Sequence, residues 1–584
     1  MPSSQDQFKV AYFSMEIALD PSIPTYSGGL GILAGDMLRE AADLELPMIA
    51  ITLVHRKGYL RQKLDEHGNQ TSELDPWDPQ SRLPSTAASA TVSIEGRPLE
   101  LRAWRYDIVG ISGHTVPVYL LDADVEANSA WDRGLTDTLY GGDLHYRICQ
   151  EALLGFGGIG ILRSLGLNDL GSYHMNEGHS SFLTLALLEE QLRRRGVETP
   201  SDADVEAVRR QCIFTTHTPV PAGHDKFSWD LVRQVLGEAR LKLIDETECC
   251  REGLLNMTYL ALRFSHYING VAMRHEEVSQ SMFPNYPIHA ITNGVHSGTW
   301  TSPQFCRLYD RYIPEWRRDN DYLRYAVGIP IRDIRDAHGR AKTALLDEVK
   351  RRTGVALDPS VLTIGFARRA TAYKRADLLF SDVERLRAIA KNAGSFQLLY
   401  GGKAHPNDGD GQAAIRRIFE DADRLRDTIR VVYVENYDWT LAAFLTSGVD
   451  LWLNTPQRPQ EASGTSGMKA ALNGVPSFSI LDGWWIEGCF DSATGWAIGH
   501  DGALQTEDPA EEIASLYEKL ERQIIPMFYK NPDSYAEVMR SAIAVNGSFF
   551  NTQRMLEQYK ANAYFPETLS SSVHTGAAPA GAAG

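Results

Sequence analysis

Short apolar runs of the kind found in buried strands alternate along this chain with segments whose apolar residues have helical spacing. Near the start, a strand-like run at residues 9–17 precedes a glycine loop at 27–31, a helical pattern at 32–44 and an apolar run at 47–54. This order is typical of a strand–helix–strand unit. The further strand-like runs are residues 212–216, 289–293, 361–367, 396–402, 429–435, 449–454 and 475–480. The alternation predicts an α/β fold whose mostly parallel sheets are covered by helices.

A domain boundary is expected near residues 297–302, where the chain leaves a predicted strand and turns through glycine and serine. We therefore predict two doubly wound, Rossmann-like domains that face a cleft, one at residues 1–298 and one at 299–566. The last helix is a candidate for crossing back to the first domain. Residues 567–584 are rich in alanine, glycine and serine, and we expect them to form a disordered tail.

Composition narrows the functional classes. The chain has 584 residues and a net charge of −17, which argues against general binding to nucleic acid or to an anionic membrane. No apolar run approaches the length of a membrane span, and the N-terminus lacks the features of a signal peptide. The spacing of the six cysteines forms no zinc pattern. We expect reduced thiols, no metal, and a cytoplasmic protein.

A glycine loop, Ser27–Gly31, separates the first predicted strand from its helix. Glycines at such a point let backbone amides face an anion, although a simple tight turn would use them too. A dinucleotide fingerprint is the rival interpretation. The spacing is not G-x-G-x-x-G, and the next strand ends in His55-Arg56-Lys57, without the acid that would hold a ribose.

A basic cluster, Arg368–Arg375, follows the predicted strand at 361–367. Cations at the end of a buried strand are poorly located for solubility and well located for phosphate. A solvated loop is the alternative.

A single lysine, Lys469, stands four residues after Thr465 in a loop of small residues, where a helix is expected to begin. Small residues let the backbone approach a bulky ligand, and a helix start suits a phosphate. A lysine there can carry an aldehyde cofactor such as pyridoxal 5'-phosphate (PLP) as a Schiff base. The physics alone is equally compatible with a surface lysine on an ordinary helix.

The run from Glu461 to Gly474 resembles the PLP-attachment signature of the α-glucan phosphorylases, E-A-S/C-G-x-G/S-x-M-K-x-x-L/M-N. The matching positions are Glu461, Ala462, Ser463, Gly464, Ser466, Met468, Lys469, Leu472 and Asn473. The resemblance extends from about Val10 to about Pro566 and implies the glycosyltransferase-B architecture in a short, bacterial-type form. That form would lack the regulatory N-terminal extension of animal enzymes, and a homodimer would be usual for relatives.

The resemblance also implies an activity. Family members cleave a terminal α-1,4-linked glucose from an α-glucan with orthophosphate and release glucose 1-phosphate with retention. PLP would be tethered by Lys469, and its phosphate would share a proton with orthophosphate. Orthophosphate would then do the general acid work that a carboxyl pair performs in glycosidases.

Individual roles follow from matching motifs. The cluster resembles K-R-I-x-E-Y-K-R, so Arg369 and Lys374 would hold the substrate phosphate and Tyr373 would touch the sugar. Arg368 stands where a lysine contacts the cofactor phosphate. His217, in an H-T-x-x-P element, completes the expected catalytic set as a glucose ligand. The other expected cofactor contacts are Thr465, Ser466, Tyr437 and Trp300, and the other expected substrate contacts are Gly28, Gly29, Leu30, Asp143, Glu177, Asn293, Glu461, Ser463 and Gly464. Glu177 is expected to orient His217.

Besides Arg368, three positions named here depart from the family pattern. Ser27 and Leu144 replace asparagines, which could alter the sugar contacts. Asp438 stands where many members carry an arginine that binds the cofactor phosphate, and an acid there would repel a dianion. Either Asp438 turns away, or Arg458 or another base substitutes for the arginine.

Two alternatives remain open. A nucleotide-sugar glycosyltransferase resembling glycogen synthase would share the fold, the glycine loop and the basic pair, but Lys469 would carry no cofactor. A non-catalytic glucan-binding protein could stack Trp484 and Trp485 on sugar rings, although core or cleft-wall positions suit these residues as well.

Overall fold

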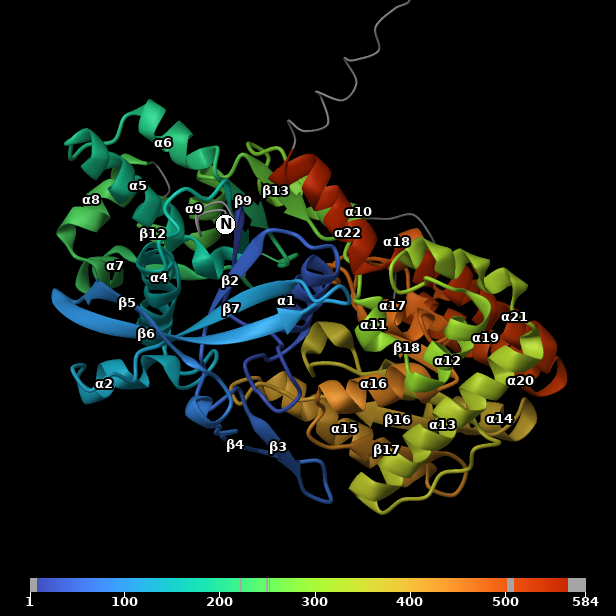
Figure 1. The fold of residues 1–584 in the computed structure, drawn as a ribbon. Coiled ribbons are helices and arrows are strands. Elements are labelled where there is room, and N and C mark those ends of the chain that lie inside the picture. The colour runs from blue at the N-terminus through green and yellow to red at the C-terminus, as the bar shows by residue number, and fades with distance from the viewer. Residues whose placement is uncertain (1–7, 221–222, 248–249, 252, 501–508, 566–584) are drawn as a thin grey trace, which may run out of the picture.

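The computed structural model describes residues 8–220, 223–247, 250–251, 253–500 and 509–565, so the tail predicted at 567–584 lies outside the described residues. Figure 1 shows the N-terminal half, coloured blue to green, beside the C-terminal half, coloured yellow to red. Each half is built around one large sheet. No helix among the described residues combines the length and apolar character needed to cross a bilayer.

The first sheet has nine strands in the order β14-β13-β9-β8-β1-β2-β7-β6-β5. All neighbours are parallel except β6, which is antiparallel to both β5 and β7. The strands are β1 (Val10–Ser14), β2 (Met48–Leu53), β5 (Ser85–Ile94), β6 (Arg97–Val109), β7 (Thr115–Asp122), β8 (Ser172–Asn176), β9 (Cys212–Thr215), β13 (Tyr267–Gly270) and β14 (His289–Ala290). The helices of this half are α1 (Gly29–Asp43), α2 (Ala130–Arg133), α3 (Leu144–Ala152), α4 (Gly158–Ser164), α5 (Phe182–Arg195), α6 (Asp202–Arg209), α7 (Trp229–Leu236), α8 (Glu238–Glu246), α9 (Met257–Arg263) and α10 (Met273–Met282).

The second sheet has six strands, all parallel, in the order β17-β16-β15-β18-β19-β20. The strands are β15 (Leu362–Ala367), β16 (Phe396–Gly401), β17 (Arg430–Val434), β18 (Leu451–Asn454), β19 (Ser477–Ile480) and β20 (Gly495–Ile498). The helices that follow α10 are α11 (Ser297–Trp300), α12 (Pro303–Tyr312), α13 (Ile331–Thr353), α14 (Val383–Asn392), α15 (Gly409–Leu425), α16 (Trp439–Gly448), α17 (Ser466–Ala471), α18 (Trp485–Gly488), α19 (Pro509–Lys519), α20 (Ile525–Lys530), α21 (Pro532–Ser541) and α22 (Thr552–Tyr559).

The predicted α/β fold with mostly parallel sheets is confirmed. Strands β15 and β16 are buried at every residue, as expected when helices cover both faces of a parallel sheet. The predicted strand–helix–strand unit at the start is β1, α1 and β2, with the helix beginning at Gly29. The sequence analysis missed β5 and β6, whose exposed and buried residues interchange along the strands, and it also missed the mostly buried β7, β8, β13 and β20.

The end of the chain returns to the first half. Met555, Leu556 and Tyr559 of α22 belong to the same apolar core as residues of β1 and β2, and Figure 1 shows α22, in red, against the green N-terminal half. Arg554 donates from Nη1 and Nη2 to the carbonyl oxygens of Thr292 and Asn293, at 2.6 and 2.9 Å. The returning segment therefore fixes the loop after β14. The domain boundary near residue 298 stays a prediction.

A hairpin of the first half forms hydrogen bonds to the second half. Its strands are β3 (Arg61–Leu64) and β4 (Gln70–Glu73). The side-chain amide of Gln62 donates to the carbonyl of Gly402 at 2.8 Å and accepts from the backbone N–H of Asn436 at 2.9 Å. Gln70 likewise donates to the carbonyl of Ala404 at 2.8 Å. These bonds hold the loops after β16 and β17 against the first half and so shape the space between the sheets.

Buried histidines give the fold a predictable response to acid. Burial lowers the pKa of His174 to about 3 and those of His55 and His275 to about 4. Because these values lie below the ordinary histidine pKa of about 6.5, the unfolded chain takes up protons that the folded chain does not. The three groups therefore favour folding above pH ~6.5, and this contribution falls as the pH drops toward 4.

We expect the imidazole resonances of these three histidines to stay at their neutral positions from pH 8 to 5, while free imidazole in the same sample titrates. Proton NMR of histidine-labelled protein measures this directly. Midpoints above pH 5.5 for these resonances would contradict the burial argument.

Candidate active site

A cavity of about 780 Å³ lies between the two halves. Its first wall comes from the glycine loop and the carboxyl ends of β1, β8 and β9, and its second wall from the ends of β15, β16 and β17 together with α17. Carboxyl ends of parallel strands are the usual ligand positions in such folds. The cavity is lined by Gly28, Gly29, Leu30, Glu177, His217, Asn293, Trp300, Arg368, Arg369, Tyr373, Lys374, Tyr437, Glu461, Ser463, Gly464, Thr465, Ser466 and Lys469. These are all of the sequence-predicted site residues except Asp143.

Lys469 extends from α17, which begins at Ser466 as the small-residue loop predicted. The side-chain nitrogen Nζ lies 3.8 Å from the centroid of the Trp300 ring, and no described residue forms a hydrogen bond or ion pair with it. Burial lowers the pKa of Lys469 to about 8. A buried, uncommitted amine with a lowered pKa has a larger neutral fraction near neutral pH than an exposed lysine, which suits it for covalent attachment.

Two members of the basic cluster share one carboxylate. Glu461 Oε2 accepts from Lys374 Nζ at 2.5 Å and from Arg368 Nη1 at 2.8 Å. Arg368 Nη2 also donates to Ser466 Oγ at 3.1 Å, which links the cluster to the lysine-bearing helix. Burial alone would raise the pKa of Glu461, but the two cations hold it below its usual range. Glu461 therefore neutralises cations that an anionic ligand could otherwise use.

Arg369 is the cluster member without a partner. No described residue forms a hydrogen bond or ion pair with its guanidinium, which lines the cavity and is open to the solvent there. The neighbouring phenols of Tyr373 and Tyr59 face the same space. A guanidinium that has no direct hydrogen-bond or ion-pair partner in a partly enclosed cavity is a strong site for a phosphate or carboxylate.

His217 is held in one orientation. Its Nε2 donates to Asn176 Oδ1 at 2.7 Å, and its backbone N–H donates to Glu177 Oε2 at 2.7 Å. Thr218 Oγ1 donates to the same carboxylate oxygen at 3.0 Å. Burial lowers the pKa of His217 to about 3, so the imidazole is neutral. With the proton on Nε2, Nδ1 is left as an acceptor for a hydroxyl group.

Glu16 is a site residue that the sequence analysis missed. Its Oε2 accepts from the backbone N–H groups of Ser27 at 2.5 Å and Gly28 at 3.3 Å, and Oε1 accepts from the Tyr140 hydroxyl at 3.0 Å. Two amides of the glycine loop are therefore already occupied. The amides that remain for an anion are those in the first turn of α1, from Gly29 onward, which have no acceptor within the helix.

Asp143 does not reach the cavity. Its carboxylate accepts from the backbone N–H of Tyr146 at 3.0 Å and caps the start of α3, and the residue is exposed. The neighbouring Leu144, which replaces a family asparagine, is exposed as well. A sugar contact by Asp143 stays a prediction, and it would require movement of this loop.

Asp438 lines the cavity, but its carboxylate also accepts a helix-capping hydrogen bond and pairs with an arginine. Its Oδ1 accepts from the backbone N–H of Leu441 at 2.7 Å and caps α16, and Oδ2 lies 3.3 Å from Arg352 Nη1. Arg458 lies outside the cavity lining and donates to the carbonyl of His500. Lys403, in contrast, lines the cavity, and although burial lowers its pKa to about 8, the charge of Asp438 acts to raise that pKa.

The two tryptophans after Asp482 belong to the core. Trp484 and Trp485 are 2% and 0% exposed and pack with the apolar cluster beneath the second sheet. They cannot stack on a sugar ring in this arrangement, so the core interpretation is confirmed. Across the described part of the chain, no three His, Cys, Asp or Glu side chains are grouped so that they could hold a metal ion.

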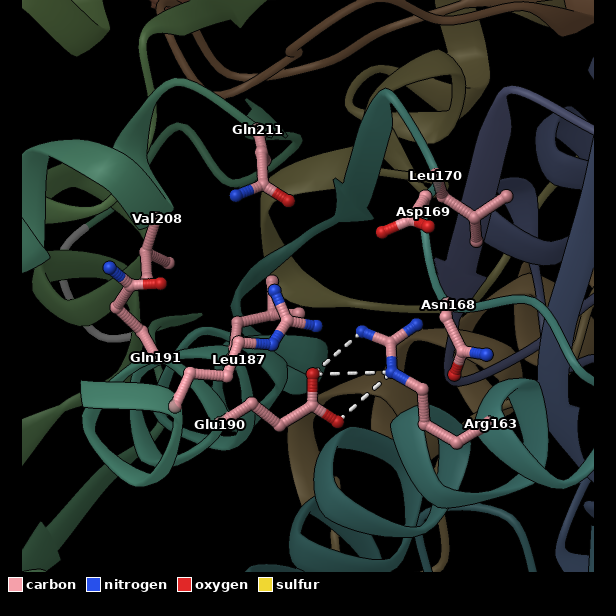
Figure 2. A pocket seen from close by; sticks show the side chains of 10 residues that line it. Arg163, Asn168, Asp169, Leu170, Leu187, Glu190, Gln191, Val208 and Gln211 are labelled. Carbon is pink, nitrogen blue, oxygen red and sulfur yellow. Dashed lines mark hydrogen bonds and ion pairs between the residues drawn. The ribbon is translucent and has the colours of Figure 1, made fainter. Parts of the chain in front are cut away.

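A second, smaller cavity of about 270 Å³ lies in the first half and contains no predicted site residue. Figure 2 shows that Arg163 and Glu190 pair with each other inside it, with Nη2 and Oε2 separated by 2.8 Å. Asp169 and Gln211 lie across from that pair. Its charged groups largely compensate one another, whereas Arg369 of the larger cavity has no hydrogen-bond or ion-pair partner among the described residues.

Known proteins are similar to this chain over nearly its whole length. The sequence model of the carbohydrate phosphorylase family matches residues 237–490. A maltodextrin phosphorylase of Thermococcus litoralis is 38% identical over 97% of this chain and 71% of its own length. Glycogen phosphorylases of Aquifex aeolicus and Mycobacterium tuberculosis are each 35% identical, covering 97% and 96% of this chain and 87% and 71% of their own lengths.

Proposed function

This chain belongs to the carbohydrate phosphorylase family, and from this premise we propose that it is an α-1,4-glucan phosphorylase. The reaction is the reversible phosphorolysis of the terminal glucose of an α-glucan, with retention, to glucose 1-phosphate. The observation that carries the proposal is the cavity in which Lys469 and Arg369 lie together, each without a hydrogen-bond or ion-pair partner among the described residues.

Members of this family use PLP, and the residues of the cavity fit that group. Lys469 offers a buried amine without a hydrogen-bond partner among the described residues, beside the flat face of Trp300. Polar atoms that lack partners within the described chain, Ser463 Oγ, Asn293 Oδ1 and Arg368 Nε, belong to residues of the same lining. When bound, PLP supplies a phosphate that can share a proton with the substrate phosphate.

The cations of the cavity allow two phosphates to approach each other. Two dianions in contact repel strongly where water is scarce, so several fixed cations are required. In our proposal Arg369 and Lys374 bind orthophosphate, the amides of Gly29 and Leu30 assist them, and Arg368 faces the cofactor phosphate. In the same proposal, the negative charge of the Asp438 carboxylate is balanced by Arg352 and Lys403 rather than by Arg458.

The terminal glucose is bound from the first half of the molecule. His217, neutral and oriented by Asn176 and Glu177, accepts from one sugar hydroxyl. Asn293, whose Oδ1 has no partner among the described residues, lines the cavity in a loop held by Arg554. Orthophosphate, oriented by the basic cluster, gives its proton to the glycosidic oxygen as the bond from that oxygen to C1 of the terminal glucose breaks. The shortened glucan leaves with a free hydroxyl group, and a phosphate oxygen then bonds to C1 on the face that the glucan left.

Replacing Glu461 with glutamine is expected to tighten the binding of a simple dianion while lowering turnover. Without the carboxylate, Lys374 and Arg368 lose their shared partner, so the dissociation constant of sulfate should fall about tenfold. Isothermal titration calorimetry of the cofactor-free protein with sulfate measures the change. Glu487→Gln is the matched control, because Glu487 is a carboxylate bonded to Thr292 outside the cavity. Unchanged sulfate affinity in Glu461→Gln would contradict this description of the cluster.

The test of the proposed function is the release of glucose 1-phosphate from maltoheptaose. We expect release that requires both orthophosphate and PLP. The main alternative, a nucleotide-sugar glycosyltransferase, predicts no release and instead turnover of UDP-glucose or ADP-glucose. A purely binding protein predicts neither reaction. The choice among glycogen, starch and short maltodextrins follows from comparing kcat/KM for the three substrates.

A homodimer and a cytoplasmic location also remain part of the proposal. The first rests on the usual state of relatives and the second on cysteines that form no disulfide framework in the sequence. Light scattering of the purified protein distinguishes a monomer from a dimer. A monomer at the concentrations used in the assay would contradict the proposed homodimer but not the proposed reaction.

A further inference from the structure

Asp36 is a buried carboxylate that none of the assigned roles uses. It lies in α1, seven residues after the first helical residue, and is 1% exposed. Its Oδ2 accepts from Trp300 Nε1 at 2.7 Å and from the backbone N–H of His296 at 3.3 Å. Its Oδ1 has no hydrogen-bond partner among the described residues. A carboxylate oxygen that is buried without a hydrogen bond needs a positive charge nearby to compensate it.

The compensating charges surround a pair of tryptophans. Lys469 Nζ lies over the ring of Trp300, 3.8 Å from its centroid, and Arg39 lies over Trp439 at 4.6 Å. The two rings are 6.1 Å apart. Arg39 Nη1 is 4.0 Å from Asp36 Oδ1, at the limit of an ion pair. Asp36 thus touches the edge of the ring whose face carries the lysine.

Lys469 and Asp36 act on each other's charge. Burial raises the pKa of Asp36, while the cations of Lys469 and Arg39, and to a smaller extent His296, act to lower it. Burial lowers the pKa of Lys469, and the opposing charge that acts on it is that of Asp36. Glu40, on the same helix, instead accepts from Thr552 Oγ1 and exerts no comparable influence on the lysine.

We propose that Asp36 is a positioning residue that keeps the nitrogen of Lys469 positively charged, both as a free amine and when it is linked to the cofactor. Trp300 fixes the carboxylate in place and separates it from the nitrogen, so the charge is stabilised without a direct bond. Helix α1 then contributes to both binding sites. The N–H groups of its first turn face the substrate phosphate, and Asp36 stabilises the charge of Lys469, which carries the cofactor. This inference rests on the proposed role of Lys469.

The test compares Asp36→Asn with wild type, using the cofactor-free protein first. Acylation of Lys469 by a water-soluble anhydride is followed by peptide mapping across pH 6 to 10. We expect the midpoint for Lys469 to fall by about one pH unit in the variant, so that acylation at pH 7 is about fivefold faster. Glu40→Gln, which removes a buried carboxylate from the same helix, should leave the midpoint unchanged.

A second measurement uses the protein reconstituted with PLP. The pH midpoint of the absorption of the bound chromophore should fall in Asp36→Asn by a similar amount. An unchanged midpoint in both measurements, with a native circular dichroism spectrum, would overturn the inference. If Asp36→Asn does not fold, Trp300→Phe removes the N–H that fixes the carboxylate and should give a smaller shift in the same direction; no shift there overturns it equally. Because the amine titration needs no cofactor, it reports on Asp36 even if Lys469 binds none.

Discussion

Replacing Lys469 with alanine should remove bound PLP and lower phosphorolysis by about three orders of magnitude or more, since the cofactor supplies the proton-sharing group. Lys469 is 7% exposed and is the lysine that lies over Trp300 in the cavity. Its loss should leave the two sheets intact, because the side chain forms no hydrogen bond or ion pair with any described residue. Absorbance of the purified protein measures bound cofactor, and release of glucose 1-phosphate from maltoheptaose measures turnover.

The matched control is Lys350→Ala. Lys350 is exposed on α13, so its removal should change neither quantity. Cofactor retained at wild-type stoichiometry by Lys469→Ala, or turnover within tenfold of wild type, would show that another residue carries the group.

Replacing Arg369 with glutamine is the second large effect. We expect kcat/KM for orthophosphate to fall about 10²- to 10³-fold, the size seen when one charge-stabilising donor is removed from an active site. The reason is that Arg369 is the member of the basic cluster with no partner among the described residues, whereas Lys374 and Arg368 are shared with Glu461. Initial rates at varied phosphate and saturating maltoheptaose give the value.

A control variant and a comparison of the two KM values test this second prediction. Arg426→Gln is the control, because the side chain of Arg426 is 77% exposed and pairs only with its neighbour Asp423 among the described residues. It should leave kcat/KM unchanged. A fall in Arg369→Gln that appears in the KM for the glucan, with the KM for phosphate unchanged, would contradict a phosphate-binding role.

The sheets could be predicted where a buried strand is a continuous apolar run, as in β15 and β16. Burial alone was not enough, because β8 is buried at every residue but contains the polar Ser172, His174 and Asn176, and it was missed. The antiparallel β5 and β6 could not be predicted in the same way, because residues exposed to solvent interrupt their apolar pattern. The return of α22 to the first half also depends on packing between segments more than 500 residues apart, such as the bond from Thr552 Oγ1 to Glu40.

The candidate site could be predicted where one short segment carries several fixed positions. The segments around Lys469 and Arg369 have that property, and the structure brings them to one cavity. Glu16 and Asp36 belong to no such segment. The signal available for Glu16 was a single charged residue within the apolar run at residues 9–17, and for Asp36 a charged residue on the buried face of a helix. Its partners, Ser27 for Glu16 and Trp300 for Asp36, come from separate parts of the fold.

The central claim is that Lys469 holds PLP next to the phosphate-binding cations. Borohydride reduction of the purified, PLP-loaded protein, followed by peptide mapping, tests it most directly. Our account predicts one pyridoxyl group per chain, on the peptide that contains Lys469. Reduction that labels no peptide, or labels a lysine outside the cavity, would contradict it.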